Sequence, residues 1–204
     1  MITVQPVLEI PPYEGFDLWP IAGVAPYSFL PLSGALTPNE VGTAVMALAS
    51  CNDIDPGDDR PPRPDDRLGS FLHGLLTSDP LFASGGFQVT DTSTGTRLVP
   101  GCCNGLEDRG DWWEVLDNED IAVGFGHNPS PTAERRGATV RLTVDGDTDG
   151  SPCIDLPAGE LRHLLEGAER ELADFLRLAT LWTAGHLPDH SERVNRALQR
   201  ALTS

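Results

Sequence analysis

The chain has 204 residues and a formal net charge of −17 at pH 7, because 31 aspartates and glutamates oppose only 14 basic residues. This charge opposes binding to nucleic-acid phosphates and to anionic membrane surfaces, which attract positively charged proteins, and it favours a basic or neutral protein partner. All 14 basic residues are arginines, so Schiff-base catalysis, a P-loop lysine and a lysine general base are excluded.

Residues 1–36 are rich in proline and predict an irregular N-terminal arm. A short strand is expected over residues 4–10 at the edge of a sheet, since Pro11 ends it. The N-terminal residues lack the charged region and apolar core of a signal peptide, and no run approaches the roughly 20 apolar residues of a membrane-spanning helix. We therefore expect a cytoplasmic protein with one domain over residues 1–204. The sequence leaves the oligomeric state open.

Two capped helices are predicted next. Thr37, Pro38 and Glu40 combine an N-cap hydroxyl, a proline at the first helical position and a glutamate at the third, which predicts a helix ending near Ser50. Asp66 is placed to cap a second, short helix. Between them, residues 52–66 hold six aspartates, four prolines and a single large apolar side chain, so we expect a mobile acidic loop.

The second half of the chain predicts a sheet and a long helix. A hairpin is indicated by Phe87 and Val89 before a run of turn residues and Leu98 after it. Alternating apolar residues predict further strands at 121–125, 138–144 and 153–156. Apolar residues three and four apart predict an amphipathic helix over 157–184, followed by a shorter one. The expected fold class is α+β, with a mostly antiparallel sheet packed against a long C-terminal amphipathic helix and additional short helices.

Unusual residues are densest between Gly101 and Pro131. Asp111 and Glu114 match a capping box, so a short helix is expected to begin at Trp112. Trp112 and Trp113 point about 100° apart around such a helix, so that only one of them can face a core squarely. The other indole is expected to be partly exposed and could contact a partner, since tryptophan dominates binding hot spots. The alternative is that both rings pack in the core and at its boundary.

The cysteines, Cys51, Cys102, Cys103 and Cys153, are too sparse for a disulfide framework and predict buried free thiols. Two kinds of chemistry stay open where Cys102 and Cys103 meet His127. One is a thiol nucleophile beside the imidazole, with Asp108 orienting the ring, and the other is a zinc site. Negative surroundings disfavour a thiolate, and adjacent cysteines lack the usual zinc spacing. We therefore predict no catalytic residue, no metal and no cofactor.

An acidic turn near the end of the sheet matches the first half of a calcium loop. Asp145, Asp147 and Asp149 alternate before Gly150, as calcium ligands do. The twelfth position, where a bidentate glutamate belongs, is Leu156, and the flanking residues predict strands rather than helices. We expect a hairpin turn here, with calcium binding left open.

Two resemblances arise from these segments. The GCCNGLED segment at 101–108, the following tryptophans and the GHNPSP segment at 126–131 resemble a pattern shared by a group of actinobacterial proteins with no established activity, in which aspartate is usual at the position of Asn128. The order of elements over about 67–182 is similar to that of the SUKH superfamily, the Smi1/Knr4-like proteins. Many bacterial members of that superfamily are immunity proteins, so this resemblance implies an α+β fold and a toxin as the partner.

Charge, missing motifs and resemblance together favour a binding module over an enzyme. The predicted function is that of an acidic protein-binding module, of immunity or regulatory-inhibitor type, for a basic protein. The alternative is an enzyme with a Cys/His site around Cys102, Cys103 and His127. The residues predicted to bind the partner are Glu107, Asp108, Asp111, Trp112, Trp113, His127 and Asn128.

Overall fold

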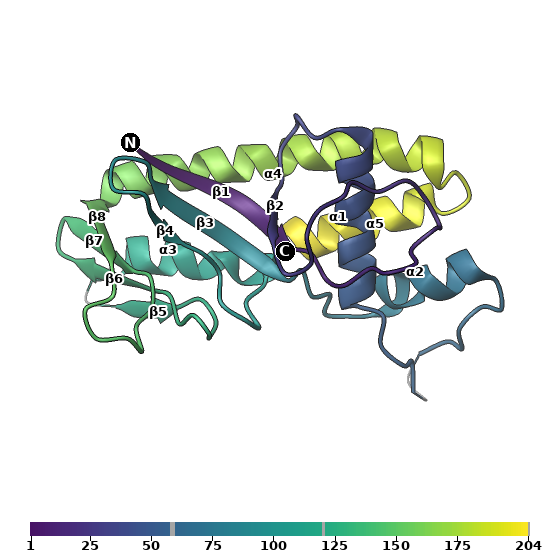
Figure 1. Ribbon diagram of the computed structural model, residues 1–204, viewed down its shortest axis with the longest axis horizontal. Coiled ribbons are helices and arrows are strands. Elements are labelled where there is room, and N and C mark those ends of the chain that lie inside the picture. The colour runs from purple at the N-terminus through teal and green to yellow at the C-terminus, as the bar shows by residue number, and fades with distance from the viewer. Residues whose placement is uncertain (58–59, 120, 204) are drawn as a thin grey trace. The chain divides into compact units, whose positions relative to one another are not determined.

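A computed structural model describes residues 1–57, 60–119 and 121–203 (Figure 1). The fold class is α+β, as the sequence predicts, with antiparallel sheets and a long C-terminal helix, α4 (Ala158–His186), that packs against sheets. The chain divides into two compact units. Unit 1 comprises Met1–Val7 and Ser84–Glu171, and unit 2 comprises Leu8–Ala83 and Leu172–Ser204. Whether they fold as the predicted single domain stays a prediction.

The first sheet has the strand order β2-β1-β3-β4. It comprises β1 (Ile2–Glu9), β2 (Phe29–Pro31), β3 (Gly85–Asp91) and β4 (Thr96–Leu98). The predicted hairpin is confirmed, since β3 and β4 are antiparallel with Val89 opposite Leu98. The prediction that the N-terminal strand lies at an edge is wrong, because β1 lies between β2 and β3.

The second sheet lies within unit 1 and has the order β5-β6-β7-β8. Its strands are β5 (Ala122–Gly124), β6 (Thr132–Arg136), β7 (Thr139–Thr143) and β8 (Cys153–Pro157). Val140 and Leu142 of β7 stand opposite Leu156 and Ile154 of β8, and all four side chains are buried. The sheet therefore has the one apolar face that the alternation predicts. Leu161, Leu165 and Ala168 form the buried stripe of the first half of α4.

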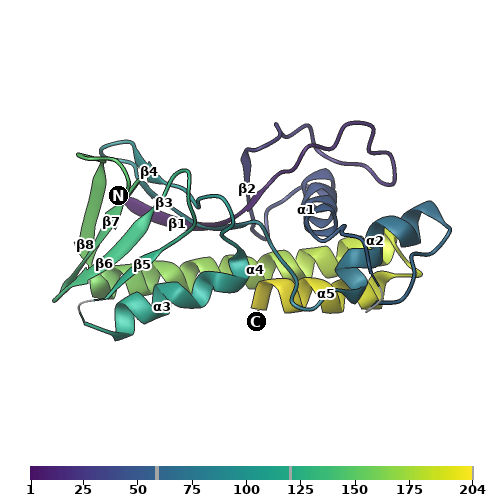
Figure 2. The same cartoon turned by 90° about the horizontal axis from the view of Figure 1, so that it is seen from below.

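The short helix of unit 1 follows a 3-10 turn. Residues Leu106–Arg109 form this turn, η1, which runs directly into α3 (Gly110–Asp117). Two ion pairs join these elements to the first half of α4, Arg109 Nε to Glu169 Oε1 at 3.1 Å and Arg162 to Asp117 at 2.6 Å. Figure 2 accordingly shows α3 running alongside this half of α4.

Unit 2 contains α1 (Pro38–Cys51), α2 (Arg67–Thr77), α5 (Ser191–Thr203), strand β2 and the second half of α4. Both predicted helix starts are confirmed. Thr37 and Glu40 form a capping box, with Thr37 N donating to Glu40 Oε2 at 2.8 Å. Asp66 Oδ1 accepts from the amide of Gly69 at 2.6 Å. These hydrogen bonds satisfy amides that a helix leaves unpaired at its first turn.

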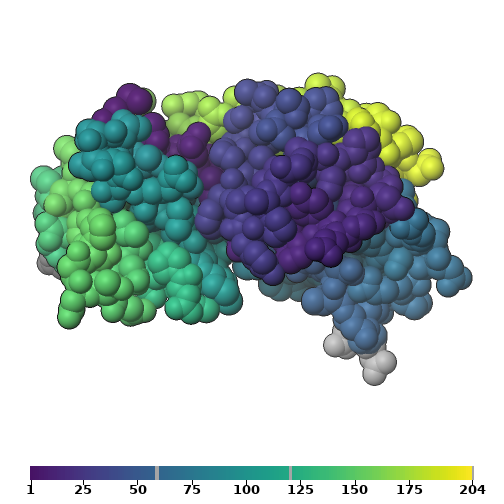
Figure 3. Space-filling model, viewed as in Figure 1, coloured from purple at the N-terminus to yellow at the C-terminus, as the bar shows by residue number. Residues whose placement is uncertain are grey.

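The N-terminal arm packs on α1 even though most of its residues beyond β1 are irregular. The indole Nε1 of buried Trp19 donates to the carbonyl of Gly42 at 2.8 Å, and Ala22 N donates to Asn39 O at 3.1 Å. Edge-to-face contacts link Trp19 to the rings of Phe16 and Trp182. In the space-filling view the arm, in purple, lies on the surface of this unit (Figure 3).

The acidic segment 52–66 has no helix or strand among its described residues, and Asp58 and Asp59 of it lie outside them. Its arginines bind neighbouring groups: Arg60 donates to Ser78 Oγ at 2.7 Å, and Arg63 pairs with Asp53 at 2.5 Å. A ring nitrogen of His73 lies 2.7 Å from the carbonyl oxygen of Pro61. The mobility expected for this segment stays a prediction.

Across the three described ranges of the chain, no helix combines the length and the apolar character needed to cross a membrane.

Candidate functional site

The helix that carries the two tryptophans starts earlier than predicted. Its first residue is Gly110, its N-cap position is Arg109, and no side chain caps it. The prediction of a capping box at Asp111 is therefore wrong. The prediction fails because η1 already turns the chain immediately before α3. Asp111 therefore lies inside the first helical turn instead of preceding it.

One tryptophan of the pair is buried and the other reaches the surface, as predicted. Trp112 is 2% exposed and stacks on Phe125, with ring centroids 4.1 Å apart and an interplanar angle of 11°. Trp113 is half-buried, and the guanidinium of Arg162 lies 5.6 Å from its ring centroid. Because Arg162 also pairs with Asp117, it holds one side of the Trp113 ring in place.

Three carboxylates interact at the N-terminal end of the helix that carries Trp113. We call the side chains of Asp108, Asp111, Trp113 and Glu114 the α3 face. Burial raises the pKa of Asp111 from its usual value, and the negative charges of Asp108 and Glu114 raise it further. Within the residues that the structure describes, no cation pairs with Asp111. The α3 face therefore concentrates negative charge at a cost in folding free energy.

Glu107, the remaining one of the three acids predicted to bind the partner, has a different environment. The carboxylate of Glu107 folds back over Gly105, where it occupies the space that a Cβ on that residue would need. Glu107 is half-buried, so it belongs to the local structure of η1 more than to an open surface.

Replacing Asp111 with asparagine should stabilise the protein at pH 7, by a few tenths of a kcal/mol for each like-charge pair removed. The folded pKa of Asp111 lies above its unfolded value, so the ionised carboxylate opposes folding above the folded pKa, and the effect vanishes below the unfolded value of about 3.9. Thermal unfolding of both proteins at pH 7 and near pH 3 measures this. Asp149→Asn, at an exposed turn, is the control, and an Asp111→Asn gain that persists unchanged at pH 3 would contradict the charge explanation.

A second cluster brings together Cys102, Cys103 and His127. Cys102 and His127 form an antiparallel β-bridge: Cys102 N donates to His127 O at 2.6 Å and His127 N donates to Cys102 O at 3.1 Å. The two Sγ atoms lie 3.4 Å apart. One ligand atom from each of the three residues lies within 4.8 Å of the other two, and all three residues are exposed.

The prediction of buried thiols is wrong for this cluster. Cys102, Cys103 and Cys153 are exposed and Cys51 is half-buried, and all four carry thiols. The physical reason is that Cys102 and Cys103 lie on a loop between β4 and η1, and Cys153 starts β8 on the face opposite buried Ile154.

His127 has an amide neighbour where an enzyme would need an acid. Nδ1 of His127 lies 3.4 Å from the side-chain nitrogen of Asn128. Among the residues that the structure describes, no carboxylate hydrogen-bonds to this ring, so Asp108 does not orient it. The two predicted partner-binding residues His127 and Asn128 thus belong with the thiols.

The acidic turn between β7 and β8 is internally hydrogen-bonded. Asp145 accepts from the amide of Ser130 at 3.2 Å and from the hydroxyl of Thr148 at 2.7 Å, and its pKa is lowered, with the Thr148 bond the largest cause. Asp147 accepts from the Ser130 hydroxyl at 2.5 Å. Both carboxylates therefore serve a hairpin turn of the kind that the sequence predicts.

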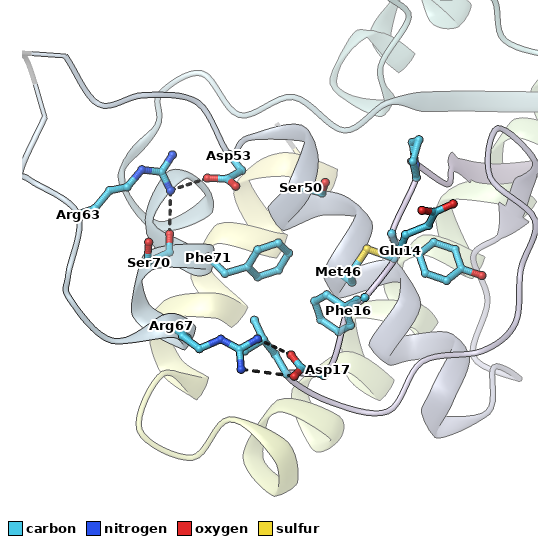
Figure 4. A pocket seen from close by; sticks show the side chains of 14 residues that line it. Glu14, Phe16, Asp17, Met46, Ser50, Asp53, Arg63, Arg67, Ser70 and Phe71 are labelled. Atoms are coloured by element: carbon cyan, nitrogen blue, oxygen red, sulfur yellow. Dashed lines mark hydrogen bonds and ion pairs between the residues drawn. The ribbon is translucent and has the colours of Figure 1, made fainter.

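Unit 2 has a pocket of about 440 Å³ that sequence reasoning did not predict (Figure 4). Phe16, Met46 and Phe71 supply its apolar wall. Arg67 pairs with Asp17 at 2.6 Å, and Arg63 pairs with Asp53, so both arginines that line the pocket are neutralised by carboxylates. Its residues come from the irregular arm, α1, the acidic segment 52–66 and α2, and no short motif signals that these meet.

Comparisons of the chain with protein-family models, with curated proteins and with solved structures gave no significant match.

Proposed function

We propose that the protein is an acidic binding module that acts as an immunity-type or regulatory inhibitor of a basic protein, and that the α3 face contacts this partner. The observation that carries the proposal is the raised pKa of Asp111, caused by burial and by the charges of Asp108 and Glu114, on the same short helix as half-buried Trp113. Like charges held together without a cation destabilise the free protein, and a basic partner would remove that cost on binding.

The surroundings of Trp113 also support a contact surface. Arg162 lies against its ring and is itself held by Asp117, so the indole has a supported side and a side open to solvent. A side chain already held in place loses less entropy when a partner binds. Tryptophan is also one of the residue types that contribute most to binding energy in protein interfaces.

The full-length chain should capture a basic partner from its native host, and the purified pair should associate at a rate that falls steeply as salt is raised. In the double variant Asp108→Lys with Glu114→Lys, we expect the association rate to fall by at least tenfold at low salt, because both exposed carboxylates steer the encounter. Stopped-flow or surface-based kinetics measure this.

The matched control is Glu160→Lys with Glu171→Lys, which changes the net charge equally at two exposed positions of α4. Trp113→Ala should raise the dissociation rate and cost at least about 2 kcal/mol of binding energy, as hot-spot truncations do. Equal losses in the two charge variants, or unchanged dissociation with Trp113→Ala, would show that the partner binds elsewhere.

The alternative, an enzyme at Cys102, Cys103 and His127, has one observation in its favour, namely that both thiols are exposed beside an imidazole. Any exposed thiol can be alkylated. The alkylation rates of Cys102 and Cys103 therefore have to be compared with that of Cys153, which is exposed on β8. An enzyme's nucleophile would react far faster than Cys153, whereas two ordinary exposed thiols would not.

A further inference from the structure

The loop that carries Cys102 and Cys103 is held tightly against the turn that carries His127. Besides the two hydrogen bonds between Cys102 and His127, Gly101 N donates to Phe125 O at 2.8 Å. A Cβ at Gly101 would collide with the carbonyl oxygen of Pro129, and a Cβ at Gly126 would collide with the backbone of Gly101 and Cys102. Glycines at both positions therefore allow the close approach of the two backbones.

This approach puts side chains from two distant segments on one side of the chain. Residues that face each other across an antiparallel bridge have neighbouring Cβ atoms, which places Cys102 beside His127. In an extended chain Cys103 would then point to the opposite side. It does not, because Cys103 adopts a left-handed conformation with φ of 65° that breaks the alternation. The result is the Sγ separation of 3.4 Å.

The conformation of Cys103 is unfavourable for its own residue type. A left-handed residue other than glycine or asparagine costs roughly 1–2 kcal/mol, and such outliers gather at binding sites. Glycine would adopt this φ without strain. The backbone turn alone therefore does not explain why position 103 is a cysteine. Its thiol points toward a second thiol and an imidazole, which suggests a role for the side chain.

We propose that Cys102, Cys103 and His127 form a zinc-binding site. Zinc takes thiolate at about 2.3 Å and imidazole nitrogen at about 2.0 Å in a tetrahedral arrangement, which puts two coordinated sulfurs roughly 3.8 Å apart. The observed Sγ separation of 3.4 Å and the 4.8 Å limit on the ligand atoms need only small side-chain rotations to reach that geometry. Adjacent cysteines lack the usual zinc spacing in the sequence, but the left-handed φ of Cys103 brings the two thiols to the same side of the chain.

The ligand set selects zinc over the hard cations. Two thiolates and an imidazole suit soft or borderline metals, whereas calcium and magnesium take oxygen ligands. Each thiol loses its proton to solvent on binding, and the fourth position is left to water.

The test is a zinc titration of the full-length protein against a chromophoric chelator, with a phosphine reductant to keep the thiols reduced. We expect one zinc ion per chain and, with cobalt in its place, a thiolate-to-cobalt charge-transfer band. Zinc should also raise the melting temperature, since it binds the folded chain. Cys102→Ser, Cys103→Gly and His127→Gln should each weaken zinc binding more than about 100-fold, beyond the loss typical of outer partners.

Two variants separate a built site from incidental thiol binding. Cys153→Ser removes an exposed thiol outside the cluster and should leave zinc affinity unchanged within about twofold. Without metal, Cys103→Gly should be at least as stable as the unmodified protein, because glycine suits the left-handed φ. Its affinity for zinc should nevertheless fall. Binding that survives His127→Gln, equal losses in Cys102→Ser and Cys153→Ser, or no zinc bound at one equivalent would overturn the proposal.

Discussion

Replacing Trp112 with alanine is expected to lower the free energy of unfolding by about 3–5 kcal/mol. The indole is 2% exposed, stacks on Phe125 with centroids 4.1 Å apart, and lies 6.3 Å from the ring of Phe87. Its removal would leave a cavity between β3, α3 and the turn after β5 that the surrounding backbone cannot fill. Denaturant unfolding with an unchanged m-value measures the loss.

The neighbouring residue supplies the control for this prediction. Trp113→Ala removes the same number of atoms from the same helix, but its ring is half-buried and contacts the surface arginine Arg162. We expect a loss of no more than about 1 kcal/mol. Similar losses for the two tryptophans would show that the division into a core ring and a surface ring is wrong.

The contrast between adjacent tryptophans shows which features a sequence determines locally. A helix turns about 100° per residue, so one ring of the pair must leave the core. Capping follows the same logic at Thr37 and Asp66, where a short side chain can only reach amides two or three residues ahead. The helix starts at Thr37 and Asp66, the hairpin of β3 and β4 and the long amphipathic helix depend on such short-range geometry and could be predicted.

Features that depend on distant segments could not be predicted in this way. Strand β6 has a single buried side chain, Ala133, so it lacks the apolar alternation that identifies a strand. The interior position of β1 depends on β2 and β3, which are separated from each other by more than fifty residues. Neither pairing leaves a periodic signal within one segment.

The same limit explains why the thiols were predicted to be buried. Cysteine is among the residues most often buried, so that composition alone favours a core position. The exposure of Cys102 and Cys103 follows from the bridge to His127 and from the φ of Cys103. The one local indication is the pair of glycines, Gly101 and Gly126. Glycine is typical of a close backbone approach, but it does not identify the segment that approaches.

Replacing Phe175 with alanine is expected to cost about 3–5 kcal/mol of stability. Phe175 is fully buried in the second half of α4, within unit 2, next along the buried stripe from Leu172. Leu181→Ala, at a position of the same helix that is 73% exposed, is the matched control and should change stability by less than about 0.5 kcal/mol.

This variant also tests whether the chain unfolds as one domain. α4 is a continuous helix of 29 residues that supplies buried side chains to both units, and helix formation is cooperative along its length. Unfolding of unit 2 should therefore disrupt the first half of α4, whose Leu161 and Leu165 are buried in unit 1. For each variant, Phe175→Ala and Trp112→Ala, we expect the amide-exchange protection of the most protected residues to fall. The loss in free energy should be the same in unit 1 as in unit 2. Protection in unit 1 that is unaffected by Phe175→Ala would instead mean that the two units open independently and that the single-domain prediction is wrong.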